Sequence, residues 1–253
     1  MNWPAEAIWQ AVEPLLPGFT VEVLPEIAST NTELMQRARD GRTEPTLLVA
    51  ERQTAGRGRL GRNWTSVPGD SLAFSLGLPL APADWSGLSL AVGVAVAESL
   101  HARIRIKWPN DLWVDDRKLA GILIETAAST LEPQGPRFAV IGIGMNVHAP
   151  RGDGYSTPPA ALDELLPDLE AGAVLLRIAR PLVESVKAFE TCGFAPFQAR
   201  FEARDLLRDR AVTLSDGTSG TAHGTTATGG LLVHTAAGMT TVTSSEVSVR
   251  PAR

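Results

Sequence analysis

Residues 103–125 read RIRIKWPNDLWVDDRKLAGILIE, and this stretch predicts paired β-strands at the centre of the fold. From Arg103 to Trp108 apolar residues alternate with basic ones, which is the period of a strand with one buried face. Asp115-Asp116 is typical of a tight turn, and the apolar run from Lys118 to Glu125 predicts the returning strand. The polar segment inside this stretch is therefore expected at one end of a buried sheet.

Lys118 leads the returning strand, and simple alternation places it on one face with Ala120, Ile122 and Ile124. Its ammonium group then faces back toward Asn110-Asp111. There it could neutralise a phosphate or a carboxylate while its stem packs on apolar atoms. A lysine reaching solvent from the edge of a sheet is the alternative that the pattern leaves open.

Outward from this stretch, the chain alternates strands and helices. Strands are predicted for residues 19–24, 46–53, 71–78 and 138–147, and helices for 5–16, 29–40, 86–101 and 171–191. Pro181 must either kink the last helix or mark its start. From about Asp205, short strands alternate with Ser-, Thr- and Gly-rich turns, which predicts a small β-barrel. The expected fold is α+β: a central mixed sheet with packed helices in residues 1–204, and the barrel in residues 205–253.

The segment from Gly56 to Arg62 reads GRGRLGR and predicts an anion-binding loop. Its three guanidinium groups repel one another unless an anion lies between them, and the glycines let backbone N–H groups approach that anion. The segment also matches G-x-G-x-x-G, but no apolar helix and no acidic residue near position 76 follow, as a dinucleotide site requires. Kinase and P-loop signatures are also absent from the sequence, and an exposed basic turn stays open.

Two further stretches predict binding surfaces. In Gly142 to Asn146, alternation places both glycines and Asn146 on one bare face, where a flat group or another backbone can lie; a bulge or a helix-packing groove is the alternative. Ser29-Thr-Asn opens a helix, with a capping box expected between Thr30 and Glu33. Such a helix start also suits a polar head group such as a ureido ring or a carboxylate. Trp64 could stack on an adenine or belong to the core.

Composition narrows the class of protein. The 253 residues are 44% hydrophobic and 20% charged, with a formal net charge of −5, which argues against a general nucleic-acid binder. The single cysteine, Cys192, excludes an internal disulfide framework. We expect no signal peptide, because no basic start precedes an apolar run, and no bilayer span, because the apolar stretch 88–97 is too short. These features favour a cytoplasmic enzyme.

Taken in order, these stretches resemble the biotin protein ligase family. The resemblance covers residues 25–150 closely and the C-terminal part more loosely. It implies a class II synthetase-like sheet followed by an SH3-like barrel. The matching strings are Ser29-Thr-Asn31, Gln53-Thr-Ala-Gly-Arg-Gly-Arg-Leu-Gly-Arg-Asn-Trp64, Lys107-Trp-Pro-Asn-Asp-Leu112, Arg117-Lys-Leu-Ala-Gly121 and Gly142-Ile-Gly-Met-Asn146.

The resemblance implies a two-step ligase reaction. Biotin and MgATP form biotinyl-5'-AMP and pyrophosphate, and a lysine of a biotin carboxyl carrier protein then attacks the mixed anhydride. A carboxylate that attacks a triphosphate brings two anions together, so fixed cations must offset their repulsion. Lys118 and Arg57 are the expected catalytic residues.

The resemblance also implies the binding residues. Residues 57–59 would belong to a mobile loop that closes over the adenylate and excludes water. Biotin would contact Ser29, Thr30, Asn31, Gln53, Gly56, Arg57, Gly58, Arg59, Lys118 and Gly121. The nucleotide would contact Arg59, Arg62, Trp64, Asn110, Lys118, Asn146 and Arg250. Mg²⁺ would be held mostly by phosphates, with Asp111 as a candidate ligand.

Some members of this family also bind DNA through an N-terminal helix-turn-helix domain. About 28 residues precede Ser29, too few for such a domain, so we expect neither operator binding nor a membrane partner. A homodimer stays open. A lipoate or octanoate ligase or transferase is the alternative enzyme, although those relatives lack the pairing of GRGR with KWPND. A non-catalytic biotin sensor would be expected to lack Lys118 or the arginines.

Overall fold

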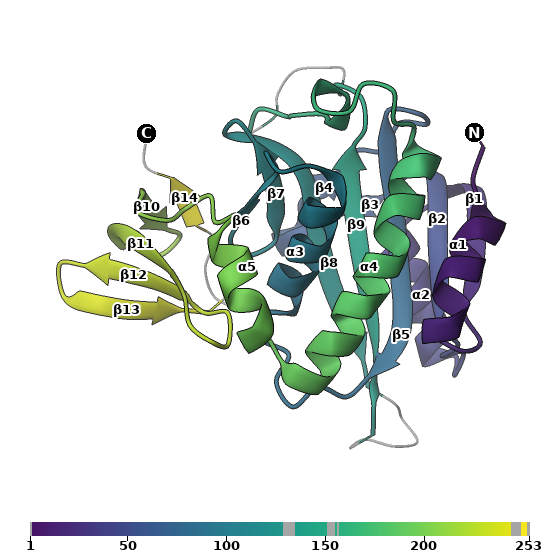
Figure 1. The fold of residues 1–253 in the computed structure, drawn as a ribbon, viewed down its shortest axis with the longest axis horizontal. Coiled ribbons are helices and arrows are strands. Elements are labelled where there is room, and N and C mark those ends of the chain that lie inside the picture. The colour runs from purple at the N-terminus through teal and green to yellow at the C-terminus, as the bar shows by residue number, and fades with distance from the viewer. Residues whose placement is uncertain (1, 129–134, 151–154, 156, 244–248, 252–253) are drawn as a thin grey trace.

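A seven-stranded sheet forms the centre of the molecule, in the order β1-β2-β5-β9-β8-β7-β6 (Figure 1). The computed structural model describes residues 2–128, 135–150, 155, 157–243 and 249–251. The strands are β1 (Thr20–Ile27), β2 (Thr46–Gln53), β5 (Ser71–Leu80), β6 (Arg105–Lys107), β7 (Asp111–Val114), β8 (Arg117–Ala127) and β9 (Arg137–Asn146). β1 runs parallel to β2 and the other pairs are antiparallel, which confirms the predicted mixed sheet.

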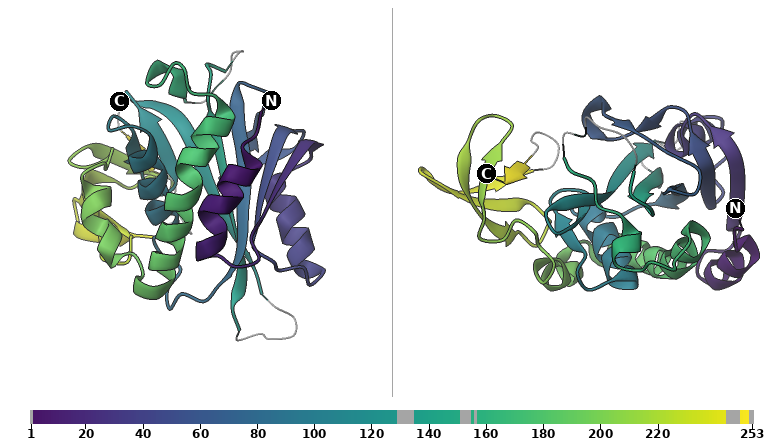
Figure 2. Two further views of the ribbon diagram at one scale, coloured as in Figure 1. Left: turned by 45° about the vertical axis from the view of Figure 1, so that its right-hand side comes forward. Right: turned by 90° about the horizontal axis from the view of Figure 1, so that it is seen from above.

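The helices cover the two faces of the sheet unequally. One face packs against α1 (Ala5–Val12), α3 (Leu88–Leu100) and α4 (Ala171–Cys192), which lie side by side below the sheet in the right-hand view of Figure 2. The opposite face carries α2 (Thr30–Arg39), which contacts β2, β5, β8 and β9. α3 is buried almost throughout, as its Ala-, Val- and Leu-rich sequence requires. The face that carries α2 thus has room for a pocket beside the start of that helix.

Alternation along β9 confirms the two faces predicted for this strand. Ile141, Ile143 and Met145 belong to the large apolar core with α3 and α4. Val140 packs with residues of α2 in a smaller apolar cluster. Gly142 lies on the α2 face as well, because a Cβ added there would overlap the Asn31 side chain. The bare strip of glycines therefore faces the side of the sheet that is open to a ligand.

A β-bulge in β8 corrects the face predicted for Lys118. Leu112 of β7 pairs with Ala120, but the next β7 residue pairs with Lys118, so one residue of β8 is inserted at this point. Beyond the bulge, Ile122 is 2% exposed in the main core. Lys118 instead lies beside Gly121, where an added Cβ would be 3.3 Å from its Nζ. The expectation that Lys118 shares a face with Ala120, Ile122 and Ile124 was wrong, because alternation cannot reveal an inserted residue.

One other segment differs from the sequence-based expectation, and the helix predicted at residues 171–191 is confirmed. The predicted arginine loop contains a short hairpin of β3 (Gly56–Arg57) and β4 (Asn63–Trp64), linked by a 3₁₀ turn at Arg59–Gly61. A second hydrogen bond, from the Gly58 N–H to the Arg62 carbonyl at 2.7 Å, closes it further. α4 begins at Ala171 and continues through Pro181, so this proline does not mark its start. None of the described helices combines the length and the apolar character needed to cross a bilayer.

The C-terminal part forms a separate antiparallel sheet. Its strands are β10 (Ala211–Leu214), β11 (Ser219–Thr225), β12 (Leu231–Thr235), β13 (Gly238–Val242) and β14 (Val249–Pro251), in the order β13-β12-β11-β10-β14. The short α5 (Gln198–Glu202) precedes it, and Figure 1 shows this sheet beside the β6 end of the main sheet. Among the described residues, β13 and β14 at the two edges of this sheet do not pair with each other, so the predicted SH3-like barrel stays a prediction. The domain boundary between residues 204 and 205 stays a prediction as well.

The junction between the two sheets contains a buried carboxyl group. Asp205 pairs with Ile106 of β6 and is 5% exposed. Its Oδ1 accepts a hydrogen bond from the Leu207 N–H at 2.9 Å, whereas Oδ2 has no hydrogen-bond partner among the described residues. Burial raises the pKa of Asp205 from 3.8 to about 6, against the opposing effects of the Leu207 N–H and of Arg208. The folded protein therefore binds this proton more tightly than the unfolded chain does.

We expect Asp205→Asn to stabilise the protein at pH 7.5. Because the pKa is raised by folding, the free energy of unfolding falls as the pH rises from about 4 to about 6, by about 3 kcal/mol at most. Urea midpoints at pH 4 and pH 7.5 should therefore show a gain of roughly 2 kcal/mol for the variant at the higher pH only. The exposed Asp168→Asn change is the control. An equal effect of D205N at both pH values would contradict the role of this proton.

Candidate active site

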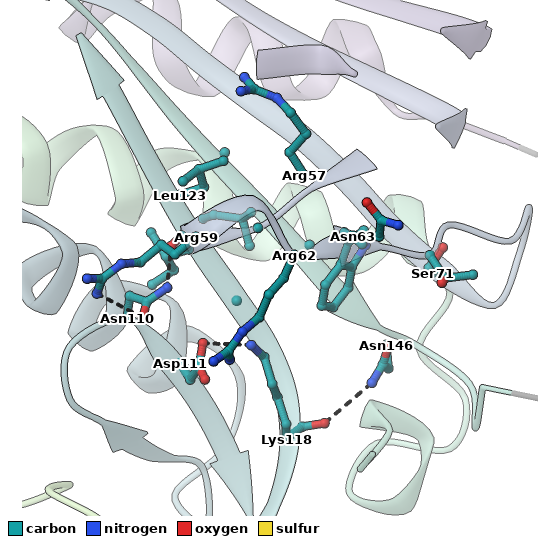
Figure 3. Close-up of a pocket in the computed structure, with 18 of the residues that line it drawn as sticks. Arg57, Arg59, Arg62, Asn63, Ser71, Asn110, Asp111, Lys118, Leu123 and Asn146 are labelled. Atoms are coloured by element: carbon teal, nitrogen blue, oxygen red, sulfur yellow. Dashed lines mark hydrogen bonds and ion pairs between the residues drawn. The ribbon is translucent and has the colours of Figure 1, made fainter. Parts of the chain in front are cut away.

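A pocket of about 1040 Å³ lies beside the start of α2 and under the arginine hairpin. It brings together stretches that are far apart in the sequence, and Figure 3 shows several of their side chains converging on the space above β8. The predicted site residues that line it are Ser29, Thr30, Asn31, Gln53, Arg57, Gly58, Arg59, Arg62, Trp64, Asn110, Asp111, Lys118, Gly121 and Asn146. All of the predicted site residues except Gly56 and Arg250 therefore line this one pocket.

The start of α2 forms one end of the pocket. Ser29 is the N-cap residue, and its Oγ accepts a hydrogen bond from the Thr32 N–H at 3.4 Å. The predicted capping box between Thr30 and Glu33 was wrong by one residue, because Thr30 is already the first helical residue. Glu33 instead accepts a hydrogen bond from Arg37 at 2.9 Å, one helical turn further on.

A buried polar network continues from this helix start. The Gln53 Oε1 accepts a hydrogen bond from the Thr30 N–H at 2.8 Å, which ties β2 to α2. Ser75 of β5 is fully buried, and its Oγ lies 2.6 Å from both the Thr30 hydroxyl and the Asn31 Oδ1. Asn31 in turn donates through Nδ2 to the Leu123 carbonyl at 3.2 Å. The network holds several polar side chains in set orientations at this end of the pocket.

The glycine strip of β9 explains how these side chains fit. A Cβ at Gly142 would overlap the amide of Asn31, and a Cβ at Gly144 would overlap the indole ring of Trp64. Trp64 therefore lies flat against Gly144, as expected for a flat group over a bare strip. Its Nε1 is buried without a hydrogen-bond partner among the described residues. Because Gly142 and Gly144 have no side chains, Asn31 and Trp64 can both pack closely against β9.

Lys118 and Asp111 form a charged pair at the other end of the pocket. The Lys118 Nζ lies 2.8 Å from the Asp111 Oδ1, so the two residues meet as predicted. The Lys118 side chain is 30% exposed, which leaves its ammonium group accessible from the pocket. Asn110 donates through Nδ2 to the Ile122 carbonyl at 2.7 Å, and this bond attaches the KWPND segment to β8. The β8 bulge is what turns Lys118 toward this pair.

The three arginines of the hairpin point in different directions. Arg57 reaches Glu125 on β8, with 2.8 Å between Nη2 and Oε2. Arg59 extends toward Asn110, with 3.4 Å between its Nη1 and Oδ1. Burial lowers the pKa of the Arg59 guanidinium, and the carboxylate of Asp111 opposes this shift. Figure 3 shows Arg62 reaching down toward Asp111 and Lys118. Arg59, Arg62 and Lys118 therefore concentrate positive charge at one end of the pocket.

Three other predicted residues need separate description. Asn146 lines the pocket, but its Nδ2 is bonded to the Ala160 carbonyl at 2.9 Å. Gly56 lies behind the pocket wall, where an added Cβ would be 2.5 Å from the Trp64 carbonyl oxygen. Arg250 belongs to β14, and its side chain lies outside the described part of the structure. Its contact with a nucleotide stays a prediction.

Sequence reasoning missed Ser75, Glu125 and residues 157–159. Ser75 interrupts an apolar strand and Glu125 ends one, so a polar residue in a buried strand was the available signal. Thr157, Pro158 and Pro159 line the pocket, and the Pro158 carbonyl accepts a hydrogen bond from the Lys118 N–H at 2.9 Å. That contact joins residues 40 positions apart, which no local pattern predicts.

The donor groups indicate which metal the site suits. Among the described residues, no group of three or more His, Cys, Asp or Glu side chains is arranged to hold an ion. Asp111 offers a carboxylate at the charged end, half engaged by Lys118. A single carboxylate fits Mg²⁺ bound mainly by phosphates, which keeps few protein ligands.

The mixed sheet of this α+β fold carries a polar helix start, a lysine–aspartate pair and an arginine hairpin around one pocket. This combination suits a small polar molecule bound beside an anion. Comparison with known proteins identifies the family to which the chain belongs. Residues 23–146 match the Biotin/lipoate A/B protein ligase family. The chain belongs to this family, and its relatives place it with the biotin protein ligases.

Three relatives illustrate the similarity. The bifunctional ligase/repressor BirA of Escherichia coli is 37% identical over 211 residues, which cover 79% of this chain and 63% of that protein. The biotin–[acetyl-CoA-carboxylase] ligase of Paracoccus denitrificans is 31% identical over 236 residues, which cover 87% and 96%. The structure of Aquifex aeolicus biotin protein ligase with biotin and ATP has a TM-score of 0.77 and 31% identity, and the match covers 92% and 99%.

Proposed function

We propose that the protein is an ATP-dependent biotin protein ligase. The observation that carries this proposal is a single pocket that joins the polar network at the start of α2 to the Lys118–Asp111 pair and the arginine hairpin. An acid bound with its head group in the network extends its carboxylate toward the cations. The related Aquifex aeolicus enzyme was solved with biotin and ATP, and the pocket has room for two such molecules.

The proposed reaction has two steps. A carboxylate oxygen of biotin attacks the α-phosphorus of ATP; a P–O bond forms, the bond to the bridging β-phosphate oxygen breaks, and pyrophosphate leaves with the electron pair. The amine of a carrier lysine then attacks the acyl carbon; a C–N bond forms, the C–O bond to AMP breaks, and the amine proton passes to solvent. Both steps move negative charge past the fixed cations, which need no reorganisation during the reaction.

Lys118 and Arg57 are the proposed catalytic residues. The Lys118 ammonium would lie between the carboxylate and the α-phosphate and reduce the repulsion between them. Arg57 would cover the acid, and the hairpin that carries it would exclude water, which hydrolyses acyl-adenylates. Residues proposed for the biotin side are Ser29, Thr30, Asn31, Gln53, Gly58 and Gly121. Those proposed for the nucleotide are Arg59, Arg62, Trp64, Asn110, Asn146 and Arg250.

Mg²⁺ accompanies ATP in the proposed reaction. Asp111 would supply the protein ligand, because its carboxylate lies beside Lys118 in the pocket. When bound, the ion would reduce the negative charge of the phosphates.

Biotin is favoured over lipoate by the chemistry of the head-group end. A ureido ring offers two N–H donors and a carbonyl acceptor, which match hydroxyl and amide groups such as those of Thr30 and Asn31. A dithiolane ring has no N–H donor and only weak sulfur acceptors, so it would make none of these hydrogen bonds. A biotin carboxyl carrier protein is the proposed acceptor, and the cytoplasm, which supplies ATP, is the proposed location.

We expect biotin-dependent exchange of labelled pyrophosphate into ATP, and no exchange with lipoate. Transfer to an isolated carrier domain should then require its acceptor lysine, with the lysine-to-arginine carrier variant as the control. If lipoate supports exchange and biotin does not, the proposed substrate is wrong although the fold is right.

A further inference from the structure

Glu125 of β8 contacts two residues that line the pocket, Asn31 and Arg57, and the proposed reaction gives it no role. Its Oε2 accepts a hydrogen bond from the Asn31 Nδ2 at 2.9 Å. The same carboxylate lies 2.8 and 3.0 Å from the Nη2 of Arg57. One acidic side chain therefore joins a head-group residue on α2 to a proposed catalytic residue on the arginine hairpin.

The ion pair between Arg57 and Glu125 is one of several contacts between the arginine hairpin and the sheet. Trp64 lies on Gly144 of β9, and Arg59 reaches Asn110 beside β7. At the head-group end, the hairpin meets β8 through the ion pair between Arg57 and Glu125. Without that ion pair, the Arg57 end would lose its charged attachment to the strand that lines the pocket.

Electrostatics explain why an acid is suited to this position. Arg57, Arg59, Arg62 and Lys118 all line the same pocket and repel one another. A carboxylate that is 25% exposed offsets the charge of Arg57. Because a guanidinium has five N–H donors and the contact with Glu125 uses only Nη2, the other two nitrogens could donate to a bound acid.

We propose that Glu125 is a positioning residue that holds Arg57 over the bound acid and, through its hydrogen bond to Asn31, couples the hairpin to the occupied head-group site. This proposal rests on the proposed function for the identity of the acid. It predicts that loss of the carboxylate charge loosens the hairpin even before a substrate binds, and weakens retention of the acid afterwards.

Glu125→Gln separates the two contacts. The glutamine oxygen still accepts the Asn31 hydrogen bond, whereas the ion pair with Arg57 is lost. Glu26→Gln is the matched control, because Glu26 of β1 forms an ion pair with Arg52 of β2 at 2.9 Å, away from the lining of the pocket. Both variants replace an Arg–Glu pair between sheet residues by an Arg–Gln pair.

Trypsin cleavage of the ligand-free protein after Arg59 or Arg62 tests the hold on the hairpin. Cleavage follows the population of the open hairpin. We expect Glu125→Gln to be cut about three- to fivefold faster than wild type, the range that a partly exposed ion pair supports, and Glu26→Gln to be cut at the wild-type rate. Cleavage of Glu125→Gln at the wild-type rate would overturn the proposal.

Pyrophosphate exchange tests the effect on the acid. We expect Glu125→Gln to raise the KM for biotin about three- to fivefold with a smaller change in kcat, and to increase the ratio of adenylate hydrolysed to biotin transferred. In an Arg57→Ala background the same substitution should have no further effect, since the partner is already absent. A rise in kcat at unchanged KM would overturn the proposal, because Glu125 would then hold Arg57 away from the substrate.

Failure of the proposed function gives a different result. If wild type shows no biotin-dependent exchange, biotin is not the substrate, and the trypsin rates alone decide whether Glu125 holds Arg57. If wild type exchanges with biotin and both variants behave as wild type, the function stands and the role of Glu125 falls.

Discussion

Replacing Lys118 by alanine is expected to lower the rate of biotin-dependent pyrophosphate exchange by a factor of about 100 to 1000. This is the usual loss when a preorganised group that stabilises developing charge is removed from an active site. Here the loss is compounded by Asp111, whose carboxylate lies 2.8 Å from the Lys118 Nζ and would face the phosphates without its partner. The effect should fall on kcat, because the repulsion is greatest as the carboxylate reaches the α-phosphorus.

Two further variants test whether the loss of exchange activity is caused by the loss of the positive charge at position 118. Lys118→Arg keeps the charge in a different geometry and should retain an intermediate rate. Lys187→Ala removes a lysine of α4 that also forms an ion pair, with Glu190, and should leave exchange unchanged. Because the Lys118 pair is partly exposed, the melting temperature should change little. Exchange by Lys118→Ala within tenfold of wild type would show that this lysine is not the catalytic cation.

Replacing Ser75 by alanine is expected to raise the KM for biotin by a factor of about 10 to 100 and to destabilise the fold by about 1–3 kcal/mol. Ser75 is fully buried, and its hydroxyl lies 2.6 Å from both Thr30 and Asn31. Its removal leaves buried polar atoms unpaired and frees the Asn31 amide to rotate. The change in kcat should be smaller, because the head group binds alike in the ground and transition states.

The matched control for Ser75 is Ser185→Ala. Ser185 is 8% exposed on α4, so it is another buried hydroxyl, and it lies outside the pocket described above. Urea denaturation and exchange kinetics on both variants separate stability from binding. A KM for biotin that stays within twofold of wild type in Ser75→Ala would show that the network supports the fold and not the head group.

The sequence predicted what depends on local periodicity. β2 was expected at residues 46–53 and spans Thr46–Gln53, and the two faces of β9 followed from alternation. The arginines and glycines of residues 56–62 also indicated the pocket, because anion-binding sites combine these residue types.

What the sequence could not predict depends on distant partners or on register. Ser75 meets Asn31 across 44 positions, and Glu125 meets it across 94. The inserted residue in β8 leaves no mark in the hydrophobic pattern, since an apolar residue stands on either face. The fold of the arginine hairpin depends on its contacts with β8, with β9 and with Asn110 beside β7, and a composition rich in Gly and Arg indicates only a loop.

The bulge in β8 has a consequence for the length of the acid that the proposed site would accept. The head-group end is defined on this strand by the Leu123 carbonyl, which accepts from Asn31, and the charged end by Lys118. They lie five positions apart, and the inserted residue shortens the path to four strand steps, or roughly 13 Å. If the acid binds as proposed, β8 would set the spacing between its ring and its carboxylate, and the bulge would shorten that spacing by one residue.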